Sequence, residues 1–155
     1  MNTEANLAVE SKSLDETLKL GAKLGANLKG GEVIELRGDI GSGKTALVRG
    51  IASSTESDDE VASPSFTLSR IYKGRVAISH YDFYRLDDPG IMKLELAESI
   101  DSDKVVIIEW AGIVEGVLDD DRLVVEIKSG KDESDRKFVF KAPKKLDYLL
   151  VGVNL

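Results

Sequence analysis

The chain has 155 residues with no cysteine, and its 28 Asp and Glu residues outnumber 21 Lys and Arg residues to give a net charge of −7. The length suits a single domain, residues 1–155, and the lack of cysteine excludes disulfides, a thiolate nucleophile and cysteine-ligated metal centres. The acidic balance disfavours a domain that grips DNA or RNA by itself, because neutralisation of phosphate charge dominates that kind of binding.

The start of the chain carries no export signal. Residues 1–12 have neither the basic nor the apolar region of a signal peptide. The longest apolar runs, such as residues 105–108, are far shorter than the roughly 20 residues that cross a bilayer. Together with the missing cysteines, these features lead us to expect a cytoplasmic protein that has no membrane contact.

The N-terminal part is predicted to alternate helices and strands. Ser13 can cap a helix while Glu16 reaches back to its start, and apolar or small residues then follow at helical spacing, which predicts a helix over residues 14–28. Residues 32–37 have the composition of a strand, and a second helix is predicted over residues 44–54.

Three strands and one helix are predicted for the middle of the chain. Residues 68–72 and 76–81 are two strands separated by a hairpin-like break at residues 73–75. Turn residues at positions 87–90 precede a predicted helix over residues 91–99. The apolar run at residues 104–109 is typical of a strand that is buried on both faces of a parallel sheet.

Two paired strands are predicted for the C-terminal part of the chain. Residues 122–128 and 137–141 alternate apolar and polar side chains, and the polar link between them indicates an antiparallel hairpin. Residues 143–150 are predicted to form a closing helix. Strands alternating with helices early and strands paired late predict an α/β mixed sheet, with a parallel core, antiparallel C-terminal strands and flanking helices.

A phosphate-binding motif lies between the first predicted strand and the second predicted helix. It matches G-x-x-x-x-G-K-[ST] with Gly38, Asp39, Ile40, Gly41, Ser42, Gly43, Lys44 and Thr45, and Ala46 is next in the helix. Glycines let backbone N–H groups approach phosphate oxygens, and the helix N-terminus adds partial positive charge. Lys44 supplies a charge for the β- and γ-phosphates, and the Thr45 hydroxyl is a hard ligand for Mg²⁺. We therefore expect a P-loop NTPase-like fold that binds a magnesium–nucleoside triphosphate.

Two acids end apolar strands and are candidates for hydrolytic chemistry. Asp82 follows the strand at residues 76–81, and Glu109 ends the run VVIIE. The carboxyl ends of parallel strands form the ligand crevice of an open α/β sheet, so we expect both acids to face the phosphates. VVIIE is the better Walker B pattern, which assigns Glu109 to the metal through water and Asp82 to the attacking water. The reverse assignment stays open.

Three further features each allow a functional and a structural interpretation. Residues 63–67 (SPSFT) are either a switch that senses the γ-phosphate or an ordinary turn. His80 is either packed or hydrogen-bonded within the sheet, which we favour, or catalytic. Trp110 either borders the nucleotide or anchors a partner, or it is a half-buried core residue.

Four sequence blocks occur in the order and spacing of one known family: GDIGSGKTALVRG, SPSFTL, HYDFYRLDDP and IIEWAG. With SLDETLKLG before them and RLVVEIK after them, they resemble the TsaE (YjeE) family over nearly the whole chain. The resemblance implies a bacterial ATPase, acting on ATP with Mg²⁺, that is required for making threonylcarbamoyladenosine in tRNA. It also implies the partners TsaD and TsaB, with TsaD transferring the threonylcarbamoyl group to adenosine 37, so that this chain meets tRNA only indirectly.

The resemblance carries roles to single residues. It implies that Lys44 and Thr45 bind phosphate and Mg²⁺ and that Asp82 and Glu109 serve hydrolysis and metal binding. It also places Trp110 beside the site and Thr17 near the adenine. Ser65 stands where the family usually has Thr, which keeps the hydroxyl. Residues 94–103 depart from the usual helix of the family, which leaves partner contacts there unmapped.

Two alternative functions stay open. One is a P-loop small-molecule kinase, which is disfavoured because no Arg cluster follows the strand at residues 104–109. The other is a non-hydrolysing scaffold, in which nucleotide binding alone orders residues 63–67 for a partner protein.

Overall fold

The computed structural model describes residues 4–39, 41–61, 69–84 and 90–155 of the chain. Its elements, in chain order, are β1 (Glu4–Ser11), α1 (Leu14–Gly25), β2 (Val33–Arg37), α2 (Lys44–Ser54), β3 (Ser69–Tyr72), β4 (Ile78–Asp82), α3 (Gly90–Ile100), β5 (Val105–Glu109), the 3₁₀ helix η1 (Ala111–Val117), β6 (Leu123–Ser129), β7 (Arg136–Pro143) and the 3₁₀ helix η2 (Lys144–Leu150). Within these residues no helix is both long and apolar enough to cross a membrane.

The strands form one seven-stranded mixed sheet in the order β1-β7-β6-β2-β5-β4-β3. Strands β6, β2, β5 and β4 run parallel to one another and make the central part of the sheet. Antiparallel strands flank this centre, with β7 and β1 on one side and β3 on the other. The predicted α/β fold, with a parallel core and antiparallel C-terminal strands, is confirmed.

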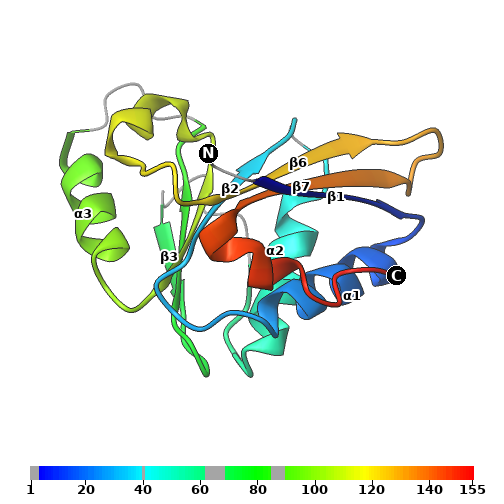
Figure 1. Ribbon diagram of the computed structural model, residues 1–155, viewed down its shortest axis with the longest axis horizontal. Coiled ribbons are helices and arrows are strands. Elements are labelled where there is room, and N and C mark those ends of the chain that lie inside the picture. The colour runs from blue at the N-terminus through cyan, green and yellow to red at the C-terminus, as the bar shows by residue number, and fades with distance from the viewer. Residues whose placement is uncertain (1–3, 40, 62–68, 85–89) are drawn as a thin grey trace.

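Helices cover both faces of the sheet. Figure 1 shows α1 and α2 on one side and α3 with η1 on the other. The core on the first side includes Leu20 and Leu47, and the core on the second side includes Leu96 and Val114. Because side chains alternate between the faces of a strand, β5 is buried along its whole length and contributes to both cores.

Helices α1 and α2 cross closely at two glycines. A Cβ atom at Gly21 would lie 2.4 Å from the Leu47 carbonyl oxygen, and one at Gly50 would lie 2.3 Å from the Leu18 carbonyl oxygen. Any side chain at either position would push the helices apart, because close-packed interiors have no spare volume. This contact brings the first half of α1 beside the start of α2, where the phosphate-binding motif ends.

Helix α1 begins as predicted and ends earlier. The Glu16 N–H donates to Ser13 Oγ at 3.1 Å, and the Lys12 N–H donates to Glu16 Oε1 at 3.0 Å. The predicted end at residue 28 is wrong, because the N–H groups of Asn27 and Leu28 bond three residues back rather than four. This tightening satisfies the last carbonyls and stops the α-helix at Gly25.

The remaining predicted elements agree with the structure to within two residues at each end, with three differences. Strand β1 was not predicted, η1 was not predicted, and the closing helix is a 3₁₀ helix over Lys144–Leu150. The candidate switch at residues 63–67 and residues 87–89 of the predicted turn lie outside the described residues.

Candidate functional site

The predicted phosphate loop links the end of β2 to the start of α2. Gly41 and Gly43 have φ angles of 80° and 109°, in the left-handed region that strains other residues, so the loop needs glycine at both positions. The Ser42 N–H donates to the Asp39 carbonyl oxygen at 3.0 Å and closes the turn. No described side chain caps α2, so its first-turn amides suit an anion. Ile40 lies outside the described residues.

The Lys44 side chain is held above this loop by three groups. Its Nζ donates to the Gly38 carbonyl oxygen at 2.5 Å, lies 4.0 Å from Glu109 Oε1 and lies 4.5 Å from the centre of the Trp110 ring. Lys44 is only 7% exposed, and this burial lowers its pKa against the opposing effect of nearby carboxylates. The ammonium group is therefore incompletely compensated, and phosphate oxygens would complete its environment.

Asp82 and Glu109 lie side by side where β4 and β5 end. The two residues are direct partners in the parallel register of these strands, and both are buried. Asp82 Oδ1 accepts a hydrogen bond from the Tyr84 N–H at 3.0 Å. The strand-end argument thus led to two acids that the fold places next to each other, and Lys44 approaches one of them. Their division of roles stays a prediction.

His80 is buried and hydrogen-bonded at both ring nitrogens. Its Nε2 lies 2.6 Å from Glu109 Oε2, and its Nδ1 lies 3.0 Å from the Tyr72 hydroxyl. This is the hydrogen-bonded alternative that we favoured from the sequence. The identity of its partner, Glu109, was missed, because the bond runs between two strands and no local pattern encodes such a contact.

Trp110 lies at the surface beside Lys44. Its backbone has φ 57° and ψ 53°, a left-handed conformation that costs a bulky residue about 1–3 kcal/mol. The side chain is 37% exposed, and its ring packs against Tyr84 with 4.8 Å between ring centroids. The indole therefore lies partly outside the core and beside Lys44, and its contact with a nucleotide stays a prediction.

A cavity of about 250 Å³ adjoins the loop on the α1 side, lined by Leu14, Thr17, Gly43, Ala46, Glu133, Ser134 and Arg136. Thr17 is buried there, with its Oγ1 2.8 Å from Ser11 Oγ. Arg136 reaches in from β7, and its Nη2 donates to the Gly41 carbonyl oxygen at 3.3 Å. Arg136 was missed in the sequence, because it follows a polar link far along the chain and no motif marks it.

The donors at the site suit Mg²⁺. Thr45, in the first turn of α2, offers a hydroxyl, and Asp82 and Glu109 offer carboxylate oxygens. Mg²⁺ takes oxygen ligands and is usually held by one or two carboxylates together with substrate phosphates and water. The two carboxylate oxygens of Glu109 differ in their contacts, since Oε2 lies 2.6 Å from His80 Nε2 and Oε1 lies 4.0 Å from Lys44 Nζ.

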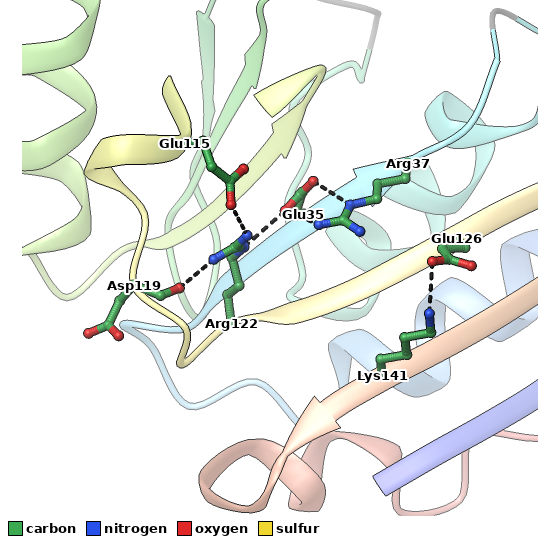
Figure 2. A network of polar contacts seen from close by, with 7 residues as sticks. All are labelled: Glu35, Arg37, Glu115, Asp119, Arg122, Glu126 and Lys141. Atoms are coloured by element: carbon green, nitrogen blue, oxygen red, sulfur yellow. Dashed lines mark hydrogen bonds and ion pairs between the residues drawn. The ribbon is translucent and has the colours of Figure 1, made fainter. Parts of the chain in front are cut away.

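A second charge cluster, the Arg122 network, lies on the η1 face of the sheet (Figure 2). Arg122 donates to Glu35 Oε1 at 2.9 Å, to Glu115 Oε1 at 2.6 Å and to the Asp119 carbonyl oxygen at 2.7 Å. Arg37 donates to Glu35 Oε2 at 2.6 Å. Burial alone would raise the pKa of Glu35, but the two guanidinium groups outweigh burial and lower it. The network fixes η1 against β2, whose end begins the phosphate loop.

The chain is similar to members of one family over most of its length. The family model described as "Threonylcarbamoyl adenosine biosynthesis protein TsaE" matches residues 11–138. Curated relatives named "tRNA threonylcarbamoyladenosine biosynthesis protein TsaE" include that of Nostoc sp., 40% identical over 63% of this chain and 63% of the relative. That of Bacillus subtilis is 34% identical over 83% of this chain and 80% of the relative.

The solved-structure match covers nearly the whole chain, and the sequence matches cover less of it. The match spans 63% of the length of the Nostoc sp. relative and 64% of the length of the Mycobacterium bovis relative, slightly under two thirds in each. A crystal structure of Bacillus subtilis YdiB superposes with a TM-score of 0.85 at 28% identity, covering 99% of this chain and 97% of that chain. The chain belongs to the TsaE family.

Proposed function

We propose that this chain is the ATP-binding and ATP-hydrolysing component of the machinery that forms N6-threonylcarbamoyladenosine at position 37 of tRNA, acting with TsaD-type and TsaB-type partners. The observation that carries the hydrolytic part is the meeting of Lys44, Asp82 and Glu109 at the end of the parallel strands, beside the glycine-rich loop. The names of the family and of the relatives support the tRNA part.

The phosphates of ATP bind across the loop at residues 38–45. Backbone N–H groups of the loop and the first turn of α2 hold phosphate oxygens, and Lys44 moves from the Gly38 carbonyl to the β- and γ-phosphates. The adenosine half takes the adjoining cavity, where Thr17, Ala46 and Arg136 line the wall. Its position next to Gly43 supports this placement, because the phosphate chain must pass that residue.

Hydrolysis uses the two strand-end acids and a magnesium ion. When bound, Mg²⁺ neutralises charge on the phosphates. Thr45 would hold it with its hydroxyl and Glu109 would hold it through water, while Asp82 would orient the attacking water. The products are ADP and phosphate, and an exchange of the roles of Asp82 and Glu109 is the alternative.

Partner proteins complete the machine. The net charge of −7 supports contact with tRNA through partners rather than through this chain, because a tRNA-binding surface needs positive charge. The protein works in the cytoplasm, with weak turnover when alone. TsaD-type and TsaB-type proteins raise that turnover.

Binding is tested by calorimetry with magnesium–ATP. We expect the wild-type chain to bind and the Lys44→Ala variant to bind about 10–100-fold more weakly. Lys145→Ala is the matched control because the Lys145 side chain is 78% exposed. Absence of any heat of binding from folded wild-type protein would end the proposal.

Turnover is tested by phosphate release, alone and with the TsaD-type and TsaB-type proteins of the same cell. We expect release to rise in the complex. Preferential transfer of phosphate to a small acceptor instead of water would indicate a kinase. Normal threonylcarbamoyladenosine formation with both Asp82→Ala and Glu109→Gln would indicate a non-hydrolysing scaffold.

A further inference from the structure

Three buried side chains on neighbouring strands form a hydrogen-bonded series that ends at Glu109. The Tyr72 hydroxyl lies 3.0 Å from His80 Nδ1, and His80 Nε2 lies 2.6 Å from Glu109 Oε2. The three residues belong to β3, β4 and β5, which are adjacent in the sheet, and each is at most 2% exposed. The series therefore runs from the edge of the sheet to the candidate hydrolytic site without contact with bulk solvent.

The register of β4 and β5 places His80 directly behind the two acids. Side chains two residues apart share a face of a strand, so His80 lies on the same face as Asp82, and Asp82 is the register partner of Glu109. The two carboxylate oxygens of Glu109 consequently have different surroundings. Oε2 bonds the imidazole, whereas Oε1 faces the Lys44 ammonium across 4.0 Å.

The direction of these hydrogen bonds depends on the tautomer of His80. An ionised carboxylate only accepts, so Nε2 is the nitrogen that carries the proton in the contact with Glu109. In a neutral imidazole, Nδ1 then accepts, and the Tyr72 hydroxyl donates to it. The Tyr72 hydroxyl and the Glu109 carboxylate thus contact opposite nitrogens of the His80 ring and together fix its orientation.

We propose that His80 is a positioning residue for Glu109, with Tyr72 fixing the imidazole from behind. The inference rests on the proposed hydrolytic function of Glu109. By holding Oε2, His80 fixes the orientation of the carboxylate, so that Oε1 would stay available to a metal-bound water. Partners that orient a functional group in this way commonly contribute about 10–100-fold to activity or metal affinity.

The first test reads the imidazole directly in nucleotide-free protein. His80 is the only histidine of the chain, so ¹⁵N-histidine labelling gives one imidazole and needs no assignment. We expect a protonated Nε2 and an unprotonated Nδ1, a change in Nδ1 in Tyr72→Phe and a change in Nε2 in Glu109→Gln. An imidazole spectrum that neither substitution alters would overturn the inference.

The second test compares variants in ATP hydrolysis within the partner complex. His80→Leu removes both hydrogen bonds, whereas His80→Gln keeps a donor near the position of Nε2. We expect kcat to fall by about 10–100-fold in His80→Leu, with KM for ATP changed much less, and to recover in part in His80→Gln. Equal losses in the two variants, or wild-type kcat in folded His80→Leu, would overturn the inference.

Two further variants keep this test decisive. Tyr72→Phe deletes one oxygen and keeps the ring, so it serves if His80→Leu does not fold, and a wild-type kcat there would remove Tyr72 from the inference. Ser79→Ala is the matched control, since Ser79 is buried next to His80 on the opposite face of β4.

The failure of this inference is distinguishable from that of the proposed function. If Glu109→Gln hydrolyses ATP at the wild-type rate, the proposed role of Glu109 is wrong. If Glu109→Gln is inactive while His80→Leu is fully active, the function stands and the positioning role is wrong.

Discussion

Two clusters of charge lie on opposite faces of the same sheet, and they are built differently. In the Arg122 network, Glu35 accepts from Arg37 at 2.6 Å and from Arg122 at 2.9 Å, so each charge touches its opposite directly (Figure 2). At the candidate site, the Lys44 ammonium bonds the neutral carbonyl of Gly38 and stays 4.0 Å from Glu109.

The pKa shifts of Glu35 and Lys44 differ in the same way as the contacts of the two clusters. Burial alone would raise the pKa of Glu35, but the guanidinium groups of Arg37 and Arg122 have the larger effect. The pKa is therefore lowered overall, and the charged form is favoured. Burial also lowers the pKa of Lys44 and outweighs the acids around it, which means that its charged form is disfavoured. We call the Arg122 network the closed cluster, because its opposite charges contact and compensate one another. We call the candidate site the open cluster, because the charge of Lys44 is incompletely compensated there.

The largest expected effect follows from breaking the closed cluster. Arg122→Leu leaves Glu35 buried with one partner fewer, so we expect the free energy of unfolding to fall by about 3–5 kcal/mol. The control is Lys141→Met, which removes the partly exposed pair of Lys141 with Glu126 and should cost at most about 1 kcal/mol. Urea unfolding measures both. Equal losses in the two variants would show that the network is not a special source of stability.

A smaller effect is expected from removing the lysine charge of the open cluster. Lys44→Met should weaken magnesium–ATP binding by about 10–100-fold, the loss of a charged hydrogen-bonding group. In ligand-free protein the variant should unfold at the same or a higher temperature, because a lysine whose pKa is lowered on folding disfavours the folded state at neutral pH. Calorimetry of both properties tests this, and a clearly lower unfolding temperature would contradict it.

The smallest effect is a dependence of stability on pH. A carboxyl whose pKa is lowered on folding contributes stability that is present above its unfolded value, here 4.5, and is lost as the pH falls through the folded pKa. Wild-type protein should therefore lose its advantage over Glu35→Gln as the pH is lowered below about 4.5. Urea unfolding of both proteins across this range measures the difference, and an advantage that stays constant on acidification would contradict the assignment.

The sequence predicted those parts of the fold that rest on local patterns. The strongly apolar β5 and the phosphate loop were predicted because their signals lie within a few consecutive residues. Strand β1 was missed because it is an edge strand with few large apolar side chains, of which Val9 is buried. Its pairing partner β7 lies near the other end of the chain, and no local pattern announces that contact.

The site was predicted in part for the same reason. Lys44 and Thr45 belong to a contiguous motif, and Asp82 and Glu109 followed from the rule that parallel strands end at one edge. The contacts of His80 with Glu109 and of Arg136 with Gly41 were not predictable, because they depend on strand register and on hairpin geometry. Register is set by the packing of the whole sheet rather than by neighbours in sequence.

The most direct measurement of the hydrolytic role is single-turnover ATP cleavage by wild-type and Glu109→Gln protein. Each protein is loaded with magnesium–ATP and then mixed with its TsaD-type and TsaB-type partners. We expect equal loading and cleavage slower by about 100-fold or more in Glu109→Gln, the size of effect typical for loss of a group that assists proton transfer or charge stabilisation. Equal cleavage rates with equal loading would contradict the assignment of this strand-end acid.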